Sequence, residues 1–241
     1  MKNFIKFIAI VSIVTIIGCK EEAEKPKVSY NKTTKKTVEQ QQDTTKITAA
    51  GLPIQFDLTN YLIYPIGNIN SYNDGSGKVY ESRWEESATS YNVANTMDNE
   101  ITGYMQNLKF QKIDSDSLVS LTKKSMLIQS VNYLPTIAFR TRQQTLLYLL
   151  ADTDTNEDGK LDTNDIKSLY LSDISGENFT KISSDLQEVL DWKIIDSRNR
   201  LYYRTIEDTN KNGKFDKNDK LHYFYLNILE KEWKAAEFMP I

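Results

Sequence analysis

Two related stretches, LYLLADTDTNEDGKLDTND at residues 147–165 and LYYRTIEDTNKNGKFDKND at residues 201–219, decide the fold of this chain. The second begins 201 − 147 = 54 residues after the first, and most loop positions are identical, so the pair forms an internal repeat. Each copy opens with an apolar run and passes into a loop rich in Asp, Asn and Gly. Short apolar runs joined by such turn residues predict β-hairpins.

The segments around both loops have the length and composition of strands. In the first copy we expect strands at residues 136–140, 146–151, 168–172 and 178–182, and in the second at 190–195, 201–206, 221–226 and 232–238. A more diverged unit precedes both copies. There, residues 61–66 would pair with 107–113 and be followed by a strand at 117–121, and residues 67–106 form a long polar insertion.

Four strands in hairpin succession resemble a blade of a β-propeller, particularly of the TolB-like kind. The expected fold class is therefore all-β, with about three antiparallel, propeller-like units at residues 52–126, 134–185 and 188–239 of a domain at 51–241. Closed propellers have about four or more blades. A further blade, an open array of sheets and completion by a partner all remain open.

Both loops match the calcium-binding pattern D-x-[DN]-x-[DN]-G, with an acid at position 12, as in EF-hands and dockerins. Ca²⁺ takes six to eight oxygen ligands, and this spacing wraps such groups around one point. We therefore expect two structural Ca²⁺ sites. The first would use Asp154, Asn156, Asp158, the Lys160 carbonyl, Asp162 and Asp165, and the second Asp208, Asn210, Asn212, the Lys214 carbonyl, Asp216 and Asp219.

The two expected sites differ in charge. Asn212 replaces Asp158, so the first loop carries four acids and the second three, which predicts tighter binding at the first. Both loops end in Asp rather than the Glu of EF-hands, which favours weaker binding. Polar hairpin turns are the alternative interpretation. A dockerin-like helix after the loop is disfavoured by the aromatic, strand-like run at residues 221–226.

The N-terminus has the pattern of a lipoprotein signal peptide at residues 1–18. Lys2 and Lys6 precede an uncharged apolar run at 7–17, and Gly18-Cys19 follows, resembling a lipoprotein signal-peptidase box. We expect lipid on Cys19 and a flexible, polar tether over residues 19–50. The sequence Lys20-Glu21-Glu22 is similar to the surface-export signal of Bacteroidota lipoproteins, which implies an outer-membrane lipoprotein facing outward.

Composition argues against two classes of function. The net charge of −3 and the absence of a continuous basic face exclude a nucleic-acid partner. His222, the single histidine, lies in an apolar run, so we expect a hydrogen-bonded core residue and no catalytic role. Zinc would need His or Cys clusters, which the sequence lacks.

The sequence therefore favours a calcium-binding cell-envelope lipoprotein that acts as a non-enzymatic binding or assembly module. Its partner would be an envelope protein or a glycan, met at the polar insertion, where Trp84, Tyr80 and Tyr91 could form an aromatic platform. The alternative is a glycan-acting hydrolase with calcium as scaffold; its candidate acids are Glu81, Glu85 and Glu86. A structural subunit with an open sheet edge is a third possibility.

Overall fold

The computed structural model describes residues 26–30, 46–70 and 93–241. The fold is all-β, with antiparallel strands, one α-helix and a short 3₁₀ helix, η1 (Asp196–Arg198). The elements are β1 (Lys46–Ala50), β2 (Tyr61–Asn70), β3 (Ala94–Met97), β4 (Glu100–Lys112), β5 (Leu118–Ser120), β6 (Leu127–Tyr133), α1 (Pro135–Thr141), β7 (Thr145–Ala151), β8 (Ser168–Asp173), β9 (Thr180–Lys181), β10 (Gln187–Ile195), β11 (Arg200–Glu207), β12 (Lys220–Asn227) and β13 (Ala236–Glu237).

The first sheet runs in the order β1-β2-β4-β6-β7-β8-β9, with β3 and β5 also paired to β4. The predicted pairing of β2 with β4 is confirmed, since Tyr61 lies opposite Lys112 and Ile66 opposite Asn107. The first residues of β4 pair with β3 and β6, and its last residues with β2 and β5. This long strand therefore joins the first expected unit and the second in one continuous sheet.

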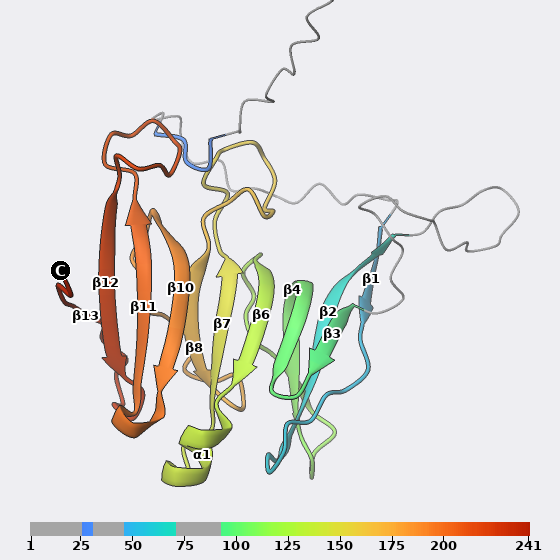
Figure 1. Ribbon diagram of the computed structural model, residues 1–241. Coiled ribbons are helices and arrows are strands. Elements are labelled where there is room, and N and C mark those ends of the chain that lie inside the picture. The colour runs from blue at the N-terminus through green and yellow to red at the C-terminus, as the bar shows by residue number, and fades with distance from the viewer. Residues whose placement is uncertain (1–25, 31–45, 71–92) are drawn as a thin grey trace, which may run out of the picture.

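The second sheet runs β10-β11-β12-β13 and contains the last four predicted strands in their predicted order. The aromatic run after the second loop is strand, because β12 pairs with β11 over its whole length. Among the described residues no strand closes either sheet into a barrel or a propeller ring. Figure 1 shows the strands lying roughly upright, with β1 at one side of the view and β13 at the other.

One predicted strand, at residues 136–140, is wrong. These residues form α1, which begins at Pro135, ends at Thr141 and is followed by Arg142 in the left-handed conformation. Proline lacks an N–H and has a fixed φ, so it suits the first turn of a helix and not a central strand. The strand that opens this unit is β6, which pairs with β7.

The expected flexible tether over residues 19–50 is corrected in two places. Residues 46–50 form β1 and pair with β2, and residues 26–30 lie against the two loops. The insertion is also shorter than expected, because β2 extends to Asn70 and β3 and the start of β4 fall within residues 67–106. Polar composition hid β1 and residues 26–30, because an edge strand and a short bound segment need few apolar residues.

Strand β7 lies between two cores. Leu146, Tyr148 and Leu150 point into the first core, with side chains from β2, β4 and β6. Leu147 points into the second core, which the first sheet shares with β10, β11 and β12. Burial on both faces explains why β7 reads as a continuous apolar run instead of an alternating one. The second sheet thereby packs on β7 and β8, which brings the two loops to the same end.

Candidate metal centre

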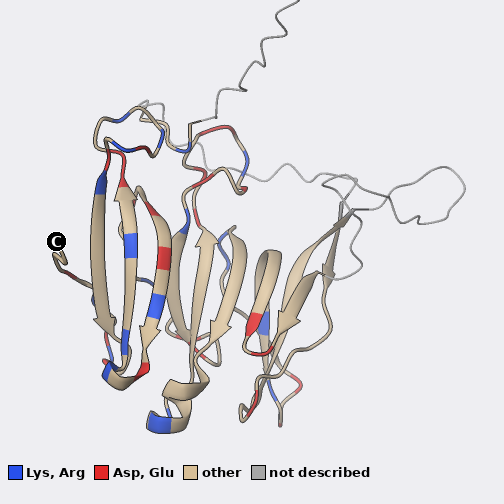
Figure 2. Cartoon of the chain, in the orientation of Figure 1, with Lys and Arg blue, Asp and Glu red and all other residues tan. Residues whose placement is uncertain are grey.

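The two loops with the calcium-binding pattern lie at one end of the sheets (Figure 1). Residues 154–165 connect β7 to β8, and residues 208–219 connect β11 to β12. Figure 2 shows acidic and basic residues in both loops at this end, which we call the loop end. The structure thus brings together the two sets of predicted ligands, which lie 54 residues apart in sequence (208 − 154 = 54).

The first loop is folded by side chains that accept hydrogen bonds from nearby backbone amides. The amide of Gly159 donates to Asp154 Oδ2 at 2.9 Å, that of Asp158 to Asn156 Oδ1 at 2.9 Å, and that of Lys160 to Asp158 Oδ1 at 2.9 Å. Short Asp and Asn side chains form such local bonds readily. They wrap the chain around the space that an ion would occupy.

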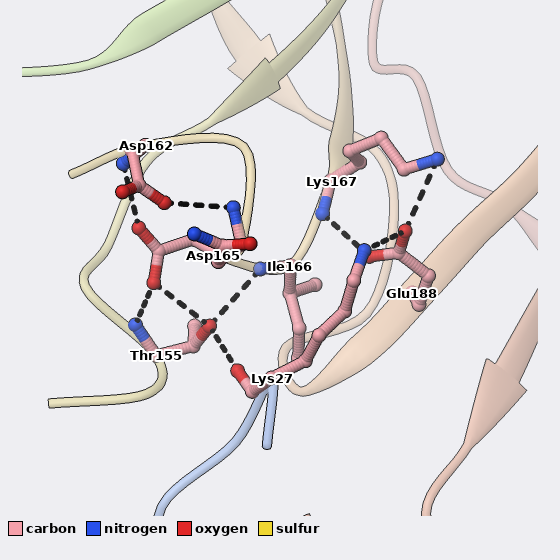
Figure 3. Close-up of polar contacts among 8 residues, drawn as sticks. Lys27, Thr155, Asp162, Asp165, Ile166, Lys167 and Glu188 are labelled. Atoms are coloured by element: carbon pink, nitrogen blue, oxygen red, sulfur yellow. Dashed lines mark hydrogen bonds and ion pairs between the residues drawn. The ribbon is translucent and has the colours of Figure 1, made fainter. Parts of the chain in front are cut away.

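Asp165, at position 12, closes the first loop. Its Oδ1 accepts the Thr155 amide at 2.7 Å and its Oδ2 accepts the Asp162 amide at 2.9 Å (Figure 3). Asp165 is fully buried, and burial raises the pKa of its carboxyl although the backbone amides oppose the rise. A carboxylate held in this state gains from a nearby cation.

The second loop repeats this arrangement. The equivalent bonds are Gly213 N to Asp208 Oδ2 at 2.6 Å, Asn212 N to Asn210 Oδ1 at 2.9 Å, Lys214 N to Asn212 Oδ1 at 2.8 Å, Thr209 N to Asp219 Oδ1 at 3.1 Å and Asp216 N to Asp219 Oδ2 at 2.7 Å. The left-handed backbone is also shared: Gly159 and Gly213 have φ of 84° and 81°. Glycine adopts this conformation without strain.

Two observations test whether the first loop fits a hard cation. Asp154 Oδ1 is buried and has no hydrogen-bond partner, although its Oδ2 accepts the Gly159 amide. Within the described residues, no Lys or Arg forms an ion pair with a predicted ligand of either loop. A buried carboxylate oxygen without a partner is costly, and a bound ion would remove that cost.

A third observation limits the donor set. In the described part of the chain no group of three or more His, Cys, Asp or Glu side chains is placed to hold a metal ion. Carboxylates alone therefore do not make the site. The Asn amide oxygens and the carbonyls of Lys160 and Lys214 would have to complete the oxygen shell, as the pattern of positions 3, 5 and 7 requires.

Residues 26–30, which the sequence assigned to the tether, form a part of the loop end that we call the N-terminal strap. The amide of Lys27 donates to the Gly213 carbonyl at 2.7 Å, and that of Ser29 donates to the Thr155 carbonyl at 2.7 Å. The Thr155 hydroxyl donates to the Lys27 carbonyl at 2.7 Å (Figure 3). The apolar Val28 within a polar segment is the signal that could have located this strap.

Glu188, on β10, was also not anticipated. It is 5% exposed, and its carboxylate lies 2.9 Å from Lys27 Nζ and 3.1 Å from Lys167 Nζ (Figure 3). It also accepts the Lys167 amide at 2.8 Å. The two cations satisfy a buried charge that would otherwise be unfavourable, and they connect the strap and the end of the first loop to the second sheet.

His222 is a hydrogen-bonded core residue, as the sequence predicted. It is 6% exposed, and its Nδ1 and Nε2 lie 2.7 Å and 2.8 Å from the carboxylates of Glu237 and Glu207. These contacts link β12 to β11 and β13. Its part in the fold is thus to hold neighbouring strands of the second sheet.

The remaining sequence candidates fall elsewhere. Glu81, Glu85, Glu86, Trp84, Tyr80 and Tyr91 lie outside the described residues, as does Cys19. Two open hollows of about 440 and 460 Å³ lie beside the first loop and share Tyr104 and Thr163. Asp162 is the single acidic residue among the described residues that line them.

Comparison with known proteins gives no relative. No protein-family model, curated protein or solved structure matches this chain. In the described part of the chain no helix is long and apolar enough to cross a membrane.

Proposed function

We propose that this protein is a calcium-binding lipoprotein of the cell envelope that works as a non-enzymatic binding or assembly module. Lipid on Cys19 would hold it in the outer membrane, with its domain on the outer face. Two structural Ca²⁺ ions, one in each loop, would stiffen the loop end. The stacked antiparallel sheets would act as blade-like units of an incomplete propeller, presenting a surface to an envelope protein or a glycan.

The observation that carries the calcium proposal is the buried, unpartnered Oδ1 of Asp154. The second loop repeats the backbone-to-side-chain hydrogen bonds of the first, but there Asp208 Oδ1 accepts the Asn212 amide at 3.1 Å, so the unpartnered oxygen is specific to the first loop. Position 1 of the pattern is a ligand in calcium loops of this kind. A cation at this oxygen would also offset the burial that raises the pKa of Asp165.

The position of the loops in the fold favours a structural role for the bound ions. Each loop connects strands that pack in one core, through Leu147 of β7 and Leu201 of β11. An ion that cross-links a loop restricts the ends of both strands, and a ligand that binds only the folded state stabilises it by mass action. We expect affinities of about 10⁻⁴–10⁻³ M, the range of extracellular modules.

The hydrolase alternative requires two facing carboxylates in a hollow, away from the calcium loops. The two hollows described above contain one acidic residue, Asp162, and it belongs to a loop. The candidate acids of that alternative, Glu81, Glu85 and Glu86, lie outside the described residues.

Counting bound ions tests the proposal. Equilibrium dialysis of the full chain should give two Ca²⁺ per molecule, and Asp154→Asn should bind one, because it removes the charge of the unpartnered oxygen. Asp114→Asn is the control, since Asp114 is an exposed residue that pairs with Lys112 away from the loops. Binding of no Ca²⁺ at millimolar concentration, or equal loss in both variants, would contradict the proposal.

A further inference from the structure

Through Lys27 and Ser29, the N-terminal strap contacts both loops at positions that do not bind the ion in the calcium-binding pattern. Ser29 donates through its amide to the carbonyl of Thr155, at position 2, and through its hydroxyl to Glu157, at position 4, at 3.0 Å. Lys27 donates to the carbonyl of Gly213, at position 6 of the second loop. Ligands come from positions 1, 3, 5, 7, 9 and 12, so strap and ion do not compete for these atoms.

Close packing fixes the strap on the second loop. Val28 is 2% exposed, and a Cβ added to Gly213 would lie 2.6 Å from the Val28 carbonyl oxygen and 2.7 Å from Pro26 Cβ. Gly159 occupies the same position of the first loop, and its added Cβ would meet nothing within 4 Å. The glycine of the second loop thus serves the strap as well as the turn.

The strap also reaches a predicted ligand. Tyr30, the last residue of the strap, hydrogen-bonds the carboxylate of Asp208. The hydroxyl is the donor, because an ionised carboxylate only accepts. Groups that hydrogen-bond a ligating carboxylate orient it and tune the affinity of the metal.

We propose that the N-terminal strap couples the two calcium sites, so that each ion strengthens the docking of the strap and the binding of the other ion. The inference rests on the proposed calcium binding. An ion in the first loop fixes the Thr155 carbonyl, and an ion in the second fixes the Gly213 carbonyl. Each ion therefore lowers the ordering cost of the strap that both carbonyls hold. Such coupling is reciprocal by thermodynamic necessity.

Hydrogen exchange of the Lys27 and Ser29 amides measures docking directly, because these amides donate to the two loops. In the full chain, Ca²⁺ should slow their exchange about tenfold or more relative to EDTA. Asp154→Asn should raise the Kd of the second loop for Ca²⁺ about fivefold or more, although it lies in the first loop. Two ions bound with unchanged exchange would overturn the coupling alone. No ions bound would overturn the proposed function with it.

A pair of alanine variants separates strap release from damage to a loop. Gly213→Ala and Gly159→Ala both place a methyl group at a left-handed glycine of the same loop position. The alanine at 213 meets the strap, while the alanine at 159 does not. At saturating Ca²⁺ we expect fast exchange of the strap amides in Gly213→Ala and slow exchange in Gly159→Ala. Equal exchange in the two variants would overturn the proposal.

Discussion

At the scale of single residues, Glu188 connects the strap to the body of the molecule. Its carboxylate is almost wholly buried and receives two ammonium groups, from Lys27 and Lys167. Asp191, on the same strand, pairs with Arg204 near the surface, with about half of its side chain exposed. The strand therefore offers a buried and an exposed ion pair for direct comparison.

We predict that Glu188→Gln lowers the free energy of unfolding by about 1–3 kcal/mol, because it leaves two cations and a buried polar group without their charged partner. Asp191→Asn should lower it by about 0–1 kcal/mol, as exposed ion pairs contribute little. Urea denaturation of both variants measures the difference. An effect of Glu188→Gln no larger than that of Asp191→Asn would show that the ion pairs of Glu188 with Lys27 and Lys167 (Figure 3) add no stability.

At the scale of elements, β7 is the strand that contributes buried side chains to both hydrophobic cores. Leu147 is 1% exposed and lies between the sheets, whereas Leu190 of β10 is 44% exposed. Leu147→Ala should therefore lower the free energy of unfolding by about 2–5 kcal/mol through the cavity that it leaves. Leu190→Ala, the control, should change it by less than about 1 kcal/mol. Equal losses of stability in the two variants would show that Leu147 is not a main contact between the sheets.

Some secondary-structure elements can be predicted from the sequence and others cannot. The loops and the strands of the second sheet follow from local spacing, because turn residues and apolar runs act over a few positions. The pairing of β4 with β6 depends on contacts between distant residues, and no local pattern encodes it. Helix α1 was not predicted, because a short apolar run fits either a helix or a strand. Pro135, the first residue of α1, decides between them, and it lies just before the run at residues 136–140.

The strap and β1 were missed for a different reason. Both lie in a polar stretch whose composition predicts a flexible chain, yet both are held mainly by backbone hydrogen bonds to the domain. Backbone donors and acceptors are the same in every residue except proline. A partner for them is visible only once the loops and β2 are in place.

At the scale of the whole molecule, the strap limits where the domain sits on a membrane. With lipid on Cys19, 26 − 19 = 7 residue steps reach Pro26, a span of at most about 25 Å. Because the strap is docked on the loops, the loop end would then face the bilayer. Helix α1 lies at the opposite end of the sheets (Figure 1), and Phe139 there is 76% exposed.

This orientation predicts a difference between two labelled variants of the lipidated chain. A fluorophore at Lys214→Cys, on the second loop, should be quenched by lipids that carry a headgroup quencher, and one at Phe139→Cys should not. Soluble quencher provides the control for exposure at both positions. Equal quenching by lipid at the two positions, or stronger quenching at residue 139, would contradict a docked strap beneath a lipidated cysteine.

Thermal unfolding of the full chain, in EDTA and then in 1 mM Ca²⁺, tests whether the two loops are structural calcium sites. Two sites with Kd near 10⁻⁴ M should together add about 2–3 kcal/mol to the free energy of unfolding, because the ion binds only the folded loops. We expect a clear rise in Tm that is lost when Asp154→Ala and Asp208→Ala are combined. An unchanged Tm at every Ca²⁺ concentration would contradict it and leave the loops as polar turns.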